Sequence, residues 1–153
     1  MSTSIVNSEK ILLDSNILIY AFDTRSEYHS LSSEIRKKAV EKLITCCISP
    51  QNLNEIYQVL TDPKAVLEPY SPREIERELQ KIIKRIEVIL PTRETAATCL
   101  QLAAKYEIKS LKIFDTFLVA TMLENGVGQI ITFNQKDFET FLEVRTIHPA
   151  DIR

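Results

Sequence analysis

Short apolar runs alternate with helical stretches along almost the whole chain, and this alternation limits the possible folds more than any other feature. The apolar runs, which we expect to form strands, cover residues 10–14, 44–48, 88–90, 129–133 and 143–147. The helical stretches between them cover residues 15–22, 30–43, 50–60, 71–86, 92–106 and 111–124. Strands that alternate with helices in this way predict an α/β fold in which helices flank a mostly parallel, short-stranded sheet.

The length of the chain suits one domain. Its 153 residues are enough to bury a sizeable core but too few for two comfortable ones. We therefore expect residues 1–153 to form a single domain that begins with a polar tail over residues 1–9. Prolines at positions 63, 69 and 72 interrupt the chain before a helix, and this predicts a helical arm over about residues 62–86.

Composition excludes several classes of protein. No run of 18 apolar residues is present, and the first ten residues hold no apolar stretch of the kind found in signal peptides, so we expect a cytoplasmic protein with no membrane partner. The three cysteines show no CxxC spacing, and there are only two histidines, His29 and His148, so neither a zinc site nor a histidine-rich metal site is expected. The net charge of −2 gives no overall attraction to nucleic acid. Any metal chemistry must therefore rest on carboxylates.

Acidic residues follow the predicted strands at the ends where parallel sheets bind ligands. Asp14 closes the first strand, Glu55 lies on the first turns of the helix after the second, and Asp137 follows the run 129–133. Each also has an ordinary interpretation, as a helix cap, a solvent-facing helix residue and a turn residue respectively. As a set they predict a site for one or two Mg²⁺ or Mn²⁺ ions, which prefer oxygen ligands.

Asp115 is the fourth candidate and lies in a helical stretch, 113–120, that is apolar on nearly every side. We therefore expect this carboxylate to be buried, which is costly unless it is paired, protonated or bound to a metal ion. Lys109 and Lys112 flank the start of the same helix and are candidates for contacting a phosphate, although most basic residues on helices simply face solvent.

Four segments resemble motifs of the PIN domains, a family that includes the VapC-type ribonuclease toxins and their solitary bacterial relatives. The segments are residues 11–16, with Asp14 and Asn16; residues 49–55, with Glu55; residues 112–121, with Asp115; and residues 132–138, which resemble the closing T-x-N-x-x-D-F signature. Their order and spacing match across residues 11–138, which is nearly the whole chain.

The resemblance implies a three-layer sandwich and a metal-dependent endoribonuclease that hydrolyses RNA phosphodiester bonds, leaving a 5′-phosphate and a 3′-hydroxyl. In this interpretation Asp14, Glu55 and Asp115 are catalytic metal ligands. Relatives place a fourth acid either where Asn134 stands or where Asp137 stands, so Asp137 is the acidic candidate and Asn134 a neutral ligand or phosphate donor. The residues expected to support these ligands are Asn16 and Thr132.

The same resemblance implies three partners, namely an RNA substrate, a second copy of the chain and, if the protein is the toxin of a toxin–antitoxin pair, a cognate antitoxin. Homodimer formation is also suggested by the arm, whose apolar residues exceed the obvious need of one domain. An aspartyl-phosphate phosphatase would need a second aspartate where Asn16 stands, and a receiver domain would need an acidic pair before the first strand's Asp14. The alternative that stays open is a non-catalytic PIN scaffold that binds RNA or a protein partner.

Overall fold

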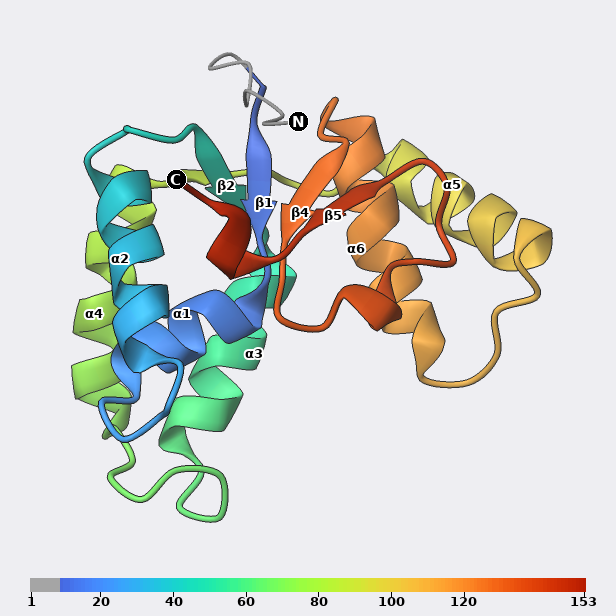
Figure 1. Ribbon diagram of the computed structural model, residues 1–153. Helices are drawn as coiled ribbons and strands as arrows, with labels where there is room; N and C mark the ends of the chain where they lie inside the picture. Colours follow the sequence, from blue (N-terminus) through green and yellow to red (C-terminus); the bar gives the residue numbers. More distant parts are fainter. Residues whose placement is uncertain (1–8) are drawn as a thin grey trace.

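The structure is a computed structural model that describes residues 9–153, in which five parallel strands form a sheet with α-helices packed on both faces (Figure 1). The strands are β1 (Ile11–Leu13), β2 (Cys46–Ile48), β3 (Glu87–Val88), β4 (Gln129–Ile131) and β5 (Arg145–Ile147). The helices are α1 (Ser15–Phe22), α2 (His29–Val40), α3 (Pro50–Thr61), α4 (Pro72–Arg85), α5 (Arg93–Lys105) and α6 (Lys112–Glu124), with short 3₁₀ turns η1 (Gln135–Asp137) and η2 (Pro149–Asp151).

The strand order is β3-β2-β1-β4-β5, and every neighbouring pair is parallel. The α/β sandwich predicted from the sequence is therefore confirmed. The strands are shorter than the apolar runs that predicted them, and β3 begins one residue before its run, at Glu87. Of the polar tail expected over residues 1–9, only Glu9 lies within the described residues.

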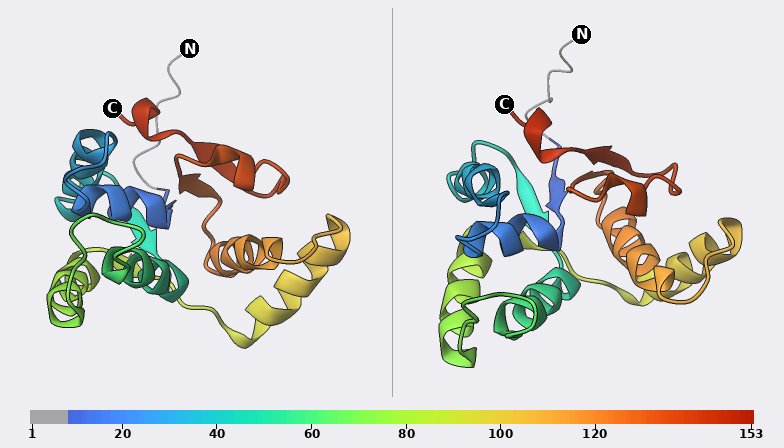
Figure 2. Two further views of the ribbon diagram at one scale, coloured as in Figure 1. Left: turned by 90° about the horizontal axis from the view of Figure 1, so that it is seen from below. Right: turned by 60° about the horizontal axis from the view of Figure 1, so that its bottom comes forward.

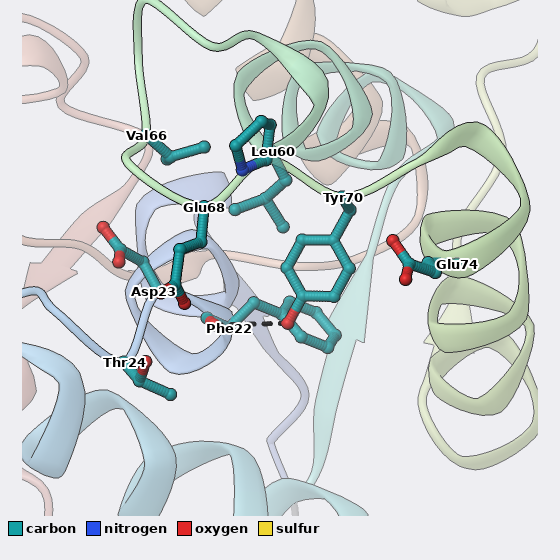
Figure 3. Close-up of a pocket in the computed structure, with 9 residues that line it drawn as sticks. Phe22, Asp23, Thr24, Leu60, Val66, Glu68, Tyr70 and Glu74 are labelled. Carbon is teal, nitrogen blue, oxygen red and sulfur yellow. Dashed lines mark hydrogen bonds between the residues drawn. The ribbon is translucent and has the colours of Figure 1, made fainter.

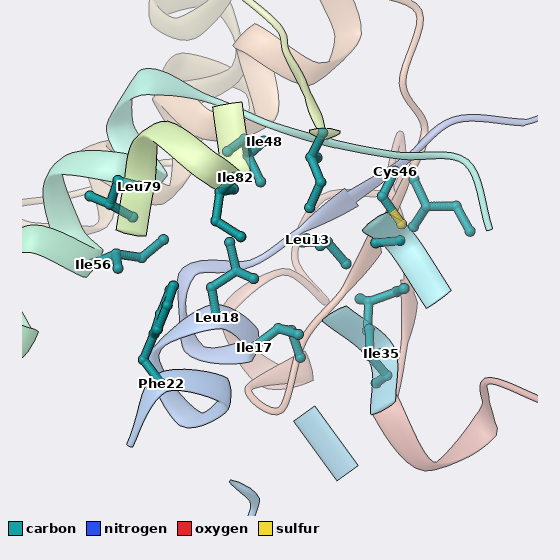
Figure 4. Packing of buried hydrophobic residues seen from close by; sticks show 14 of the residues in the cluster. Leu13, Ile17, Leu18, Phe22, Ile35, Cys46, Ile48, Ile56, Leu79 and Ile82 are labelled. Carbon is teal, nitrogen blue, oxygen red and sulfur yellow. The ribbon is translucent and has the colours of Figure 1, made fainter. Parts of the chain in front are cut away.

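Alternate residues of each strand point to opposite faces, and this divides the interior into two cores. Leu13 and Ile48 belong to a core that α1, α2, α3 and α4 cover (Figure 4), whereas Leu12 and Cys47 belong to a second core beneath α5 and α6. Figure 2 shows the same division from two further directions, with α1–α4 on one side of the sheet and α5 and α6 on the other.

Two helix starts follow the sequence signals closely. The Ser49 hydroxyl accepts a hydrogen bond from the backbone N–H of Asn52 at 3.2 Å, and Pro50 takes the first helical position of α3. The Ser71 hydroxyl and the Glu74 carboxylate form a capping box at the start of α4. These caps fix where α3 and α4 begin, and α3 carries Glu55.

The segment expected to form an arm, about residues 62–86, consists of a loop and α4, which packs against α2 and α3. Its apolar residues Ile75, Leu79 and Ile82 are buried in the core beneath α1–α4. These three are therefore used within the chain, whereas Leu67 and Ile83 of the same segment are exposed, at 78% and 41%. None of the helices within residues 9–153 is both long and apolar enough to cross a membrane.

Candidate active site

Asp14 stands at the carboxyl end of the central strand β1 and serves as the N-cap of α1. Its Oδ1 accepts a hydrogen bond from the Ser15 backbone N–H at 2.8 Å. Its Oδ2 accepts one from the Thr132 hydroxyl at 2.7 Å and one from Asn16 Nδ2 at 3.2 Å. The capping and the functional interpretations of Asp14 are thus compatible, and Asn16 and Thr132 lie where the resemblance places them.

The Asp14 carboxylate is held in an environment that disfavours its charge. The pKa of Asp14 is raised from 3.8 to about 6, mainly by burial, against the lowering effect of the hydrogen bonds from Thr132 and Ser15. The negative charges of Glu55 and Asp115 also contribute to the increase. A carboxylate that is buried, hydrogen-bonded and close to other carboxylates is typical of functional sites rather than of structural ion pairs.

Glu55 lies on α3 and is half-buried, so it does not simply face solvent. Gln51, one turn earlier, donates from Nε2 to Glu55 Oε1 at 3.4 Å and to the backbone carbonyl of Phe114 at 3.0 Å. Gln51 thereby connects α3 to α6, the helix that carries Asp115. The sequence analysis missed this residue, and its spacing of four residues from Glu55 was the only available signal.

Asp115 is not buried as expected, because 36% of its side chain is exposed. The first turn of α6 extends beyond the sheet, so Leu111 and Phe114 are 77% and 59% exposed, and continuous burial begins only at Leu118. Partial burial still raises the pKa of Asp115, Lys112 lowers it, and the charges of Asp137 and Glu55 raise it. Asp14, rather than Asp115, is therefore the buried carboxylate of the set.

Lys112 opens α6 and connects Asp115 to the 3₁₀ turn η1. Its Nζ lies 3.3 Å from Asp115 Oδ2 and also donates to the backbone carbonyl of Asp137. The Asp137 side chain itself is exposed. Asn134 is exposed too, and its backbone N–H donates to the Thr132 hydroxyl at 3.0 Å, while Lys109 lies exposed before α6.

The four acids are within electrostatic reach of one another, but they do not form a ready-made ligand cluster. Among residues 9–153, no three side chains of histidine, cysteine, aspartate or glutamate are grouped so that they could hold a metal ion between them. The chemistry of the set nevertheless fits Mg²⁺ or Mn²⁺, because all the donors are oxygens and their mutual repulsion favours a cation. Mg²⁺ in particular often binds through only one or two carboxylates and keeps several waters.

A groove opens beside Glu55, between α3 and α6, with a volume of about 930 Å³. The residues that line it are Ser49, Pro50, Gln51, Asn54, Glu55, Gln58, Pro91, Cys99, Ile113, Phe114, Phe117 and Thr121. Its α6 wall is mainly apolar, and the sequence gave no direct sign of it, because the groove arises from the separation of two helices that are distant in the chain.

Comparisons with known proteins agree with this fold. The family model described as PIN domain matches residues 11–142. No protein with a curated description matches the chain. Similar folds occur in three solved structures: VapBC2 from Rickettsia felis bound to a promoter DNA fragment, DNA-bound VapBC from Salmonella typhimurium, and Mycobacterium tuberculosis VapC20, described as a Sarcin-Ricin loop cleaving toxin.

The likeness extends over nearly all of each structure. The Rickettsia protein is 19% identical with a TM-score of 0.65, and the match covers 91% of this chain and 98% of that one. The Salmonella protein is 19% identical with a TM-score of 0.66, and the match covers 92% and 98%. The Mycobacterium protein is 13% identical with a TM-score of 0.64, and the match covers 88% and 98%.

Proposed function

This chain belongs to the PIN domain family, and on that premise we propose that it is a metal-dependent endoribonuclease that hydrolyses RNA phosphodiester bonds as the toxin of a toxin–antitoxin pair. The observation that carries the proposal is Asp14, a buried carboxylate whose pKa is raised to about 6 near the charges of Glu55 and Asp115. Such an arrangement is unfavourable in an isolated fold and becomes favourable when a divalent cation binds.

We assign the cation to Asp14, Glu55 and Asp115, with Asp137 as an outer candidate. When bound there, Mg²⁺ or Mn²⁺ would lower the pKa of water and offset the charge that develops on the phosphate. The chain's own residues do the positioning. Thr132 and Asn16 fix the orientation of the Asp14 carboxylate by their hydrogen bonds to Oδ2.

RNA as the substrate class is supported by two observations of different kinds. One solved structure with the same fold is described as a toxin that cleaves the Sarcin-Ricin loop. In this chain, the groove between α3 and α6 is lined by Glu55 and by Phe114, whose side chain is 59% exposed. Unpaired bases of RNA stack on such rings, so the groove can receive a nucleotide that flanks the cleaved bond.

An antitoxin partner is supported by the VapBC structures, which are toxin–antitoxin proteins with this fold. A second cavity, of about 310 Å³, lies at the end of α1 against the loop before α4 (Figure 3). Its lining combines the apolar Phe22, Leu60 and Val66 with Asp23, Glu68 and Glu74. This combination suits a partner segment with apolar and basic side chains, and the helical arm forms part of the cavity's lining.

We also propose a homodimer, with its interface on the side of α5 and α6 rather than on the helical arm. Because Ile75, Leu79 and Ile82 of α4 are buried, we place the interface with a second copy on the side of α5 and α6 instead. Leu90 before α5, Leu100 on α5 and Leu111 just before α6 are exposed, at 59%, 68% and 77%. Burial of these side chains against a second copy would remove an apolar surface from water.

The test is a cleavage assay with protein that has been refolded free of any bound partner. Purified transfer and ribosomal RNA are incubated with the wild type and with Asp14→Asn, in Mg²⁺, in Mn²⁺ and in EDTA, and the product ends are mapped. We expect cleavage that EDTA and Asp14→Asn both abolish, with 5′-phosphate products. Cleavage that survives in Asp14→Asn would contradict the site, and a folded wild type that cuts neither RNA in either metal would favour the non-catalytic scaffold.

A further inference from the structure

We propose that the Lys112 ammonium is a built-in cation that takes the place of a second metal ion, so that a single Mg²⁺ or Mn²⁺ binds on the Asp14–Glu55 side of the site. This inference rests on the proposed function, because it assumes that the acids bind a divalent cation. It assigns Lys112 a positioning role that a lysine on a solvated helix face does not have.

The contacts of Lys112 connect three parts of the chain. Its Nζ lies 3.3 Å from Asp115 Oδ2 within α6, donates to the backbone carbonyl of Asp137 in η1, and lies 5.7 Å from the centre of the Phe141 ring. Only 29% of its side chain is exposed. Lysine loses much rotamer freedom when it is fixed in this way, so several simultaneous contacts are needed to hold its charge in one place.

The charge distribution is uneven across the site. Lys112 is the cation closest to Asp115, and its charge opposes the effect of Asp137 and Glu55 on that carboxylate. By contrast, no basic side chain within residues 9–153 is hydrogen-bonded or ion-paired to Asp14, whose oxygens are held by Ser15, Asn16 and Thr132. Nor does any described basic side chain pair with Glu55, whose hydrogen-bond partner is Gln51.

Two cations cannot share the space between Asp115 and η1 without strong repulsion. A divalent ion there would lie within a few ångströms of the Lys112 ammonium, and like charges at that distance repel even near a protein surface. The uncompensated carboxylates are therefore those of Asp14 and Glu55. A metal ion on that side can still use Asp115 as a shared ligand, while Lys112 remains available to donate to a phosphate oxygen.

The experiment is a calorimetric titration of Mn²⁺ into the metal-free protein without RNA, run beside the cleavage assay. We expect the wild type to bind one Mn²⁺ per chain. Lys112→Met should bind Mn²⁺ about tenfold more tightly or take up a second ion, since a repelling charge is removed, and yet should cleave RNA at least about tenfold more slowly. This opposite movement of metal affinity and cleavage would not follow from simple loss of a structural contact.

Two further variants control the charge and its position. Lys112→Arg keeps the charge, so it should still bind one Mn²⁺ and should retain more cleavage than Lys112→Met. Lys136→Met removes an exposed lysine next to Asp137 and should match the wild type in both measurements. If Lys112→Met fails to fold, the stoichiometry of the wild type and of Lys112→Arg decides the question.

The inference is overturned if the wild type binds two Mn²⁺ per chain, or if folded Lys112→Met binds one Mn²⁺ no more tightly than the wild type. These results are separable from a failure of the proposed function. A wild type that binds one Mn²⁺ but never cuts RNA would contradict the proposed ribonuclease function and leave the proposed role of Lys112 intact. A wild type that cuts RNA while it binds two Mn²⁺ would support the ribonuclease function and contradict the proposed role of Lys112.

Discussion

Replacing Asp14 by asparagine should make the metal-free protein more stable while it abolishes cleavage. The pKa of Asp14 rises from an ordinary 3.8 to about 6, mainly because the carboxylate is buried. A difference of about two units between the folded and unfolded pKa lowers the free energy of unfolding by roughly 3 kcal/mol when Asp14 is charged. Asparagine has nearly the same shape and no charge, so this unfavourable contribution disappears.

Part of the gain is offset by lost hydrogen bonds. The Asp14 Oδ2 position accepts from both Thr132 and Asn16, and an amide NH₂ placed there cannot accept from either. The Thr132 hydroxyl already accepts from the Asn134 backbone N–H and from Asn16, so it cannot accept from the amide as well. Both hydrogen bonds to Oδ2 are therefore lost, at about 1 kcal/mol each. The net gain is therefore on the order of 1 kcal/mol, or a rise in Tm of about 3 °C for a chain of this size.

The sign of the pH dependence makes the prediction specific. The folded-state pKa lies above the unfolded value, so the folded protein binds the extra proton and the destabilisation exists only when Asp14 is charged. The destabilisation is fully present above about pH 6 and vanishes as the pH falls toward about 4. The advantage of Asp14→Asn over the wild type should shrink in the same way.

Differential scanning calorimetry in EDTA, at about pH 7.5 and about pH 4.5, measures both effects. Asp151→Asn, at an exposed position in η2, is the matched control and should follow the wild type at both pH values. The reasoning would be refuted by an Asp14→Asn protein that is less stable than the wild type at the higher pH, or by a stability difference that does not change with pH.

The remaining predictions concern the other acids, the metal, the core and the assembly. Asp115→Asn should also abolish cleavage but should stabilise the metal-free fold less than Asp14→Asn, as melting curves would show, because the Asp115 side chain is 36% exposed and already paired with Lys112. Mg²⁺ or Mn²⁺ at about 100 times its dissociation constant should stabilise the wild type by about 2.7 kcal/mol and Asp14→Asn far less; equal shifts would argue against the site. Ile75→Ala should lower the free energy of unfolding in urea by about 3 kcal/mol, because Ile75 of α4 is buried in the core. A loss near zero would indicate that α4 is an arm separate from the core. Light scattering at tens of micromolar should give the mass of a dimer, and a monomer would contradict the proposed pairing.

Much of the fold could be predicted because its signals are local. Alternating apolar runs and helices, together with the caps at Ser49 and Ser71, depend on residues that are close in the chain. The proximity of Asp14 and Glu55 could likewise be predicted, because the residues that follow the strand ends of a parallel sheet gather at one edge.

The relative burial of the acids could not be predicted from the sequence. The pattern around Asp115 is apolar on all sides, but helical periodicity does not reveal where a helix extends past the sheet, and here the first turn of α6 does so. The apolar side chain of Phe114 lines the groove rather than a core. Gln51 was missed for a similar reason, since its contact with α6 joins residues that are 63 positions apart.

The division of the interior into two cores has a mechanical consequence. Glu55 lies on α3, which covers one core, and Asp115 lies on α6, which covers the other. The Gln51 side-chain amide connects these two helices beside the groove. The carboxylates are therefore aligned by the packing of two separate layers on one thin sheet. A core mutation in either layer, or a small molecule bound in the groove that separates α3 from α6, would move these carboxylates apart. Cleavage would then be lost although no acidic residue had been changed.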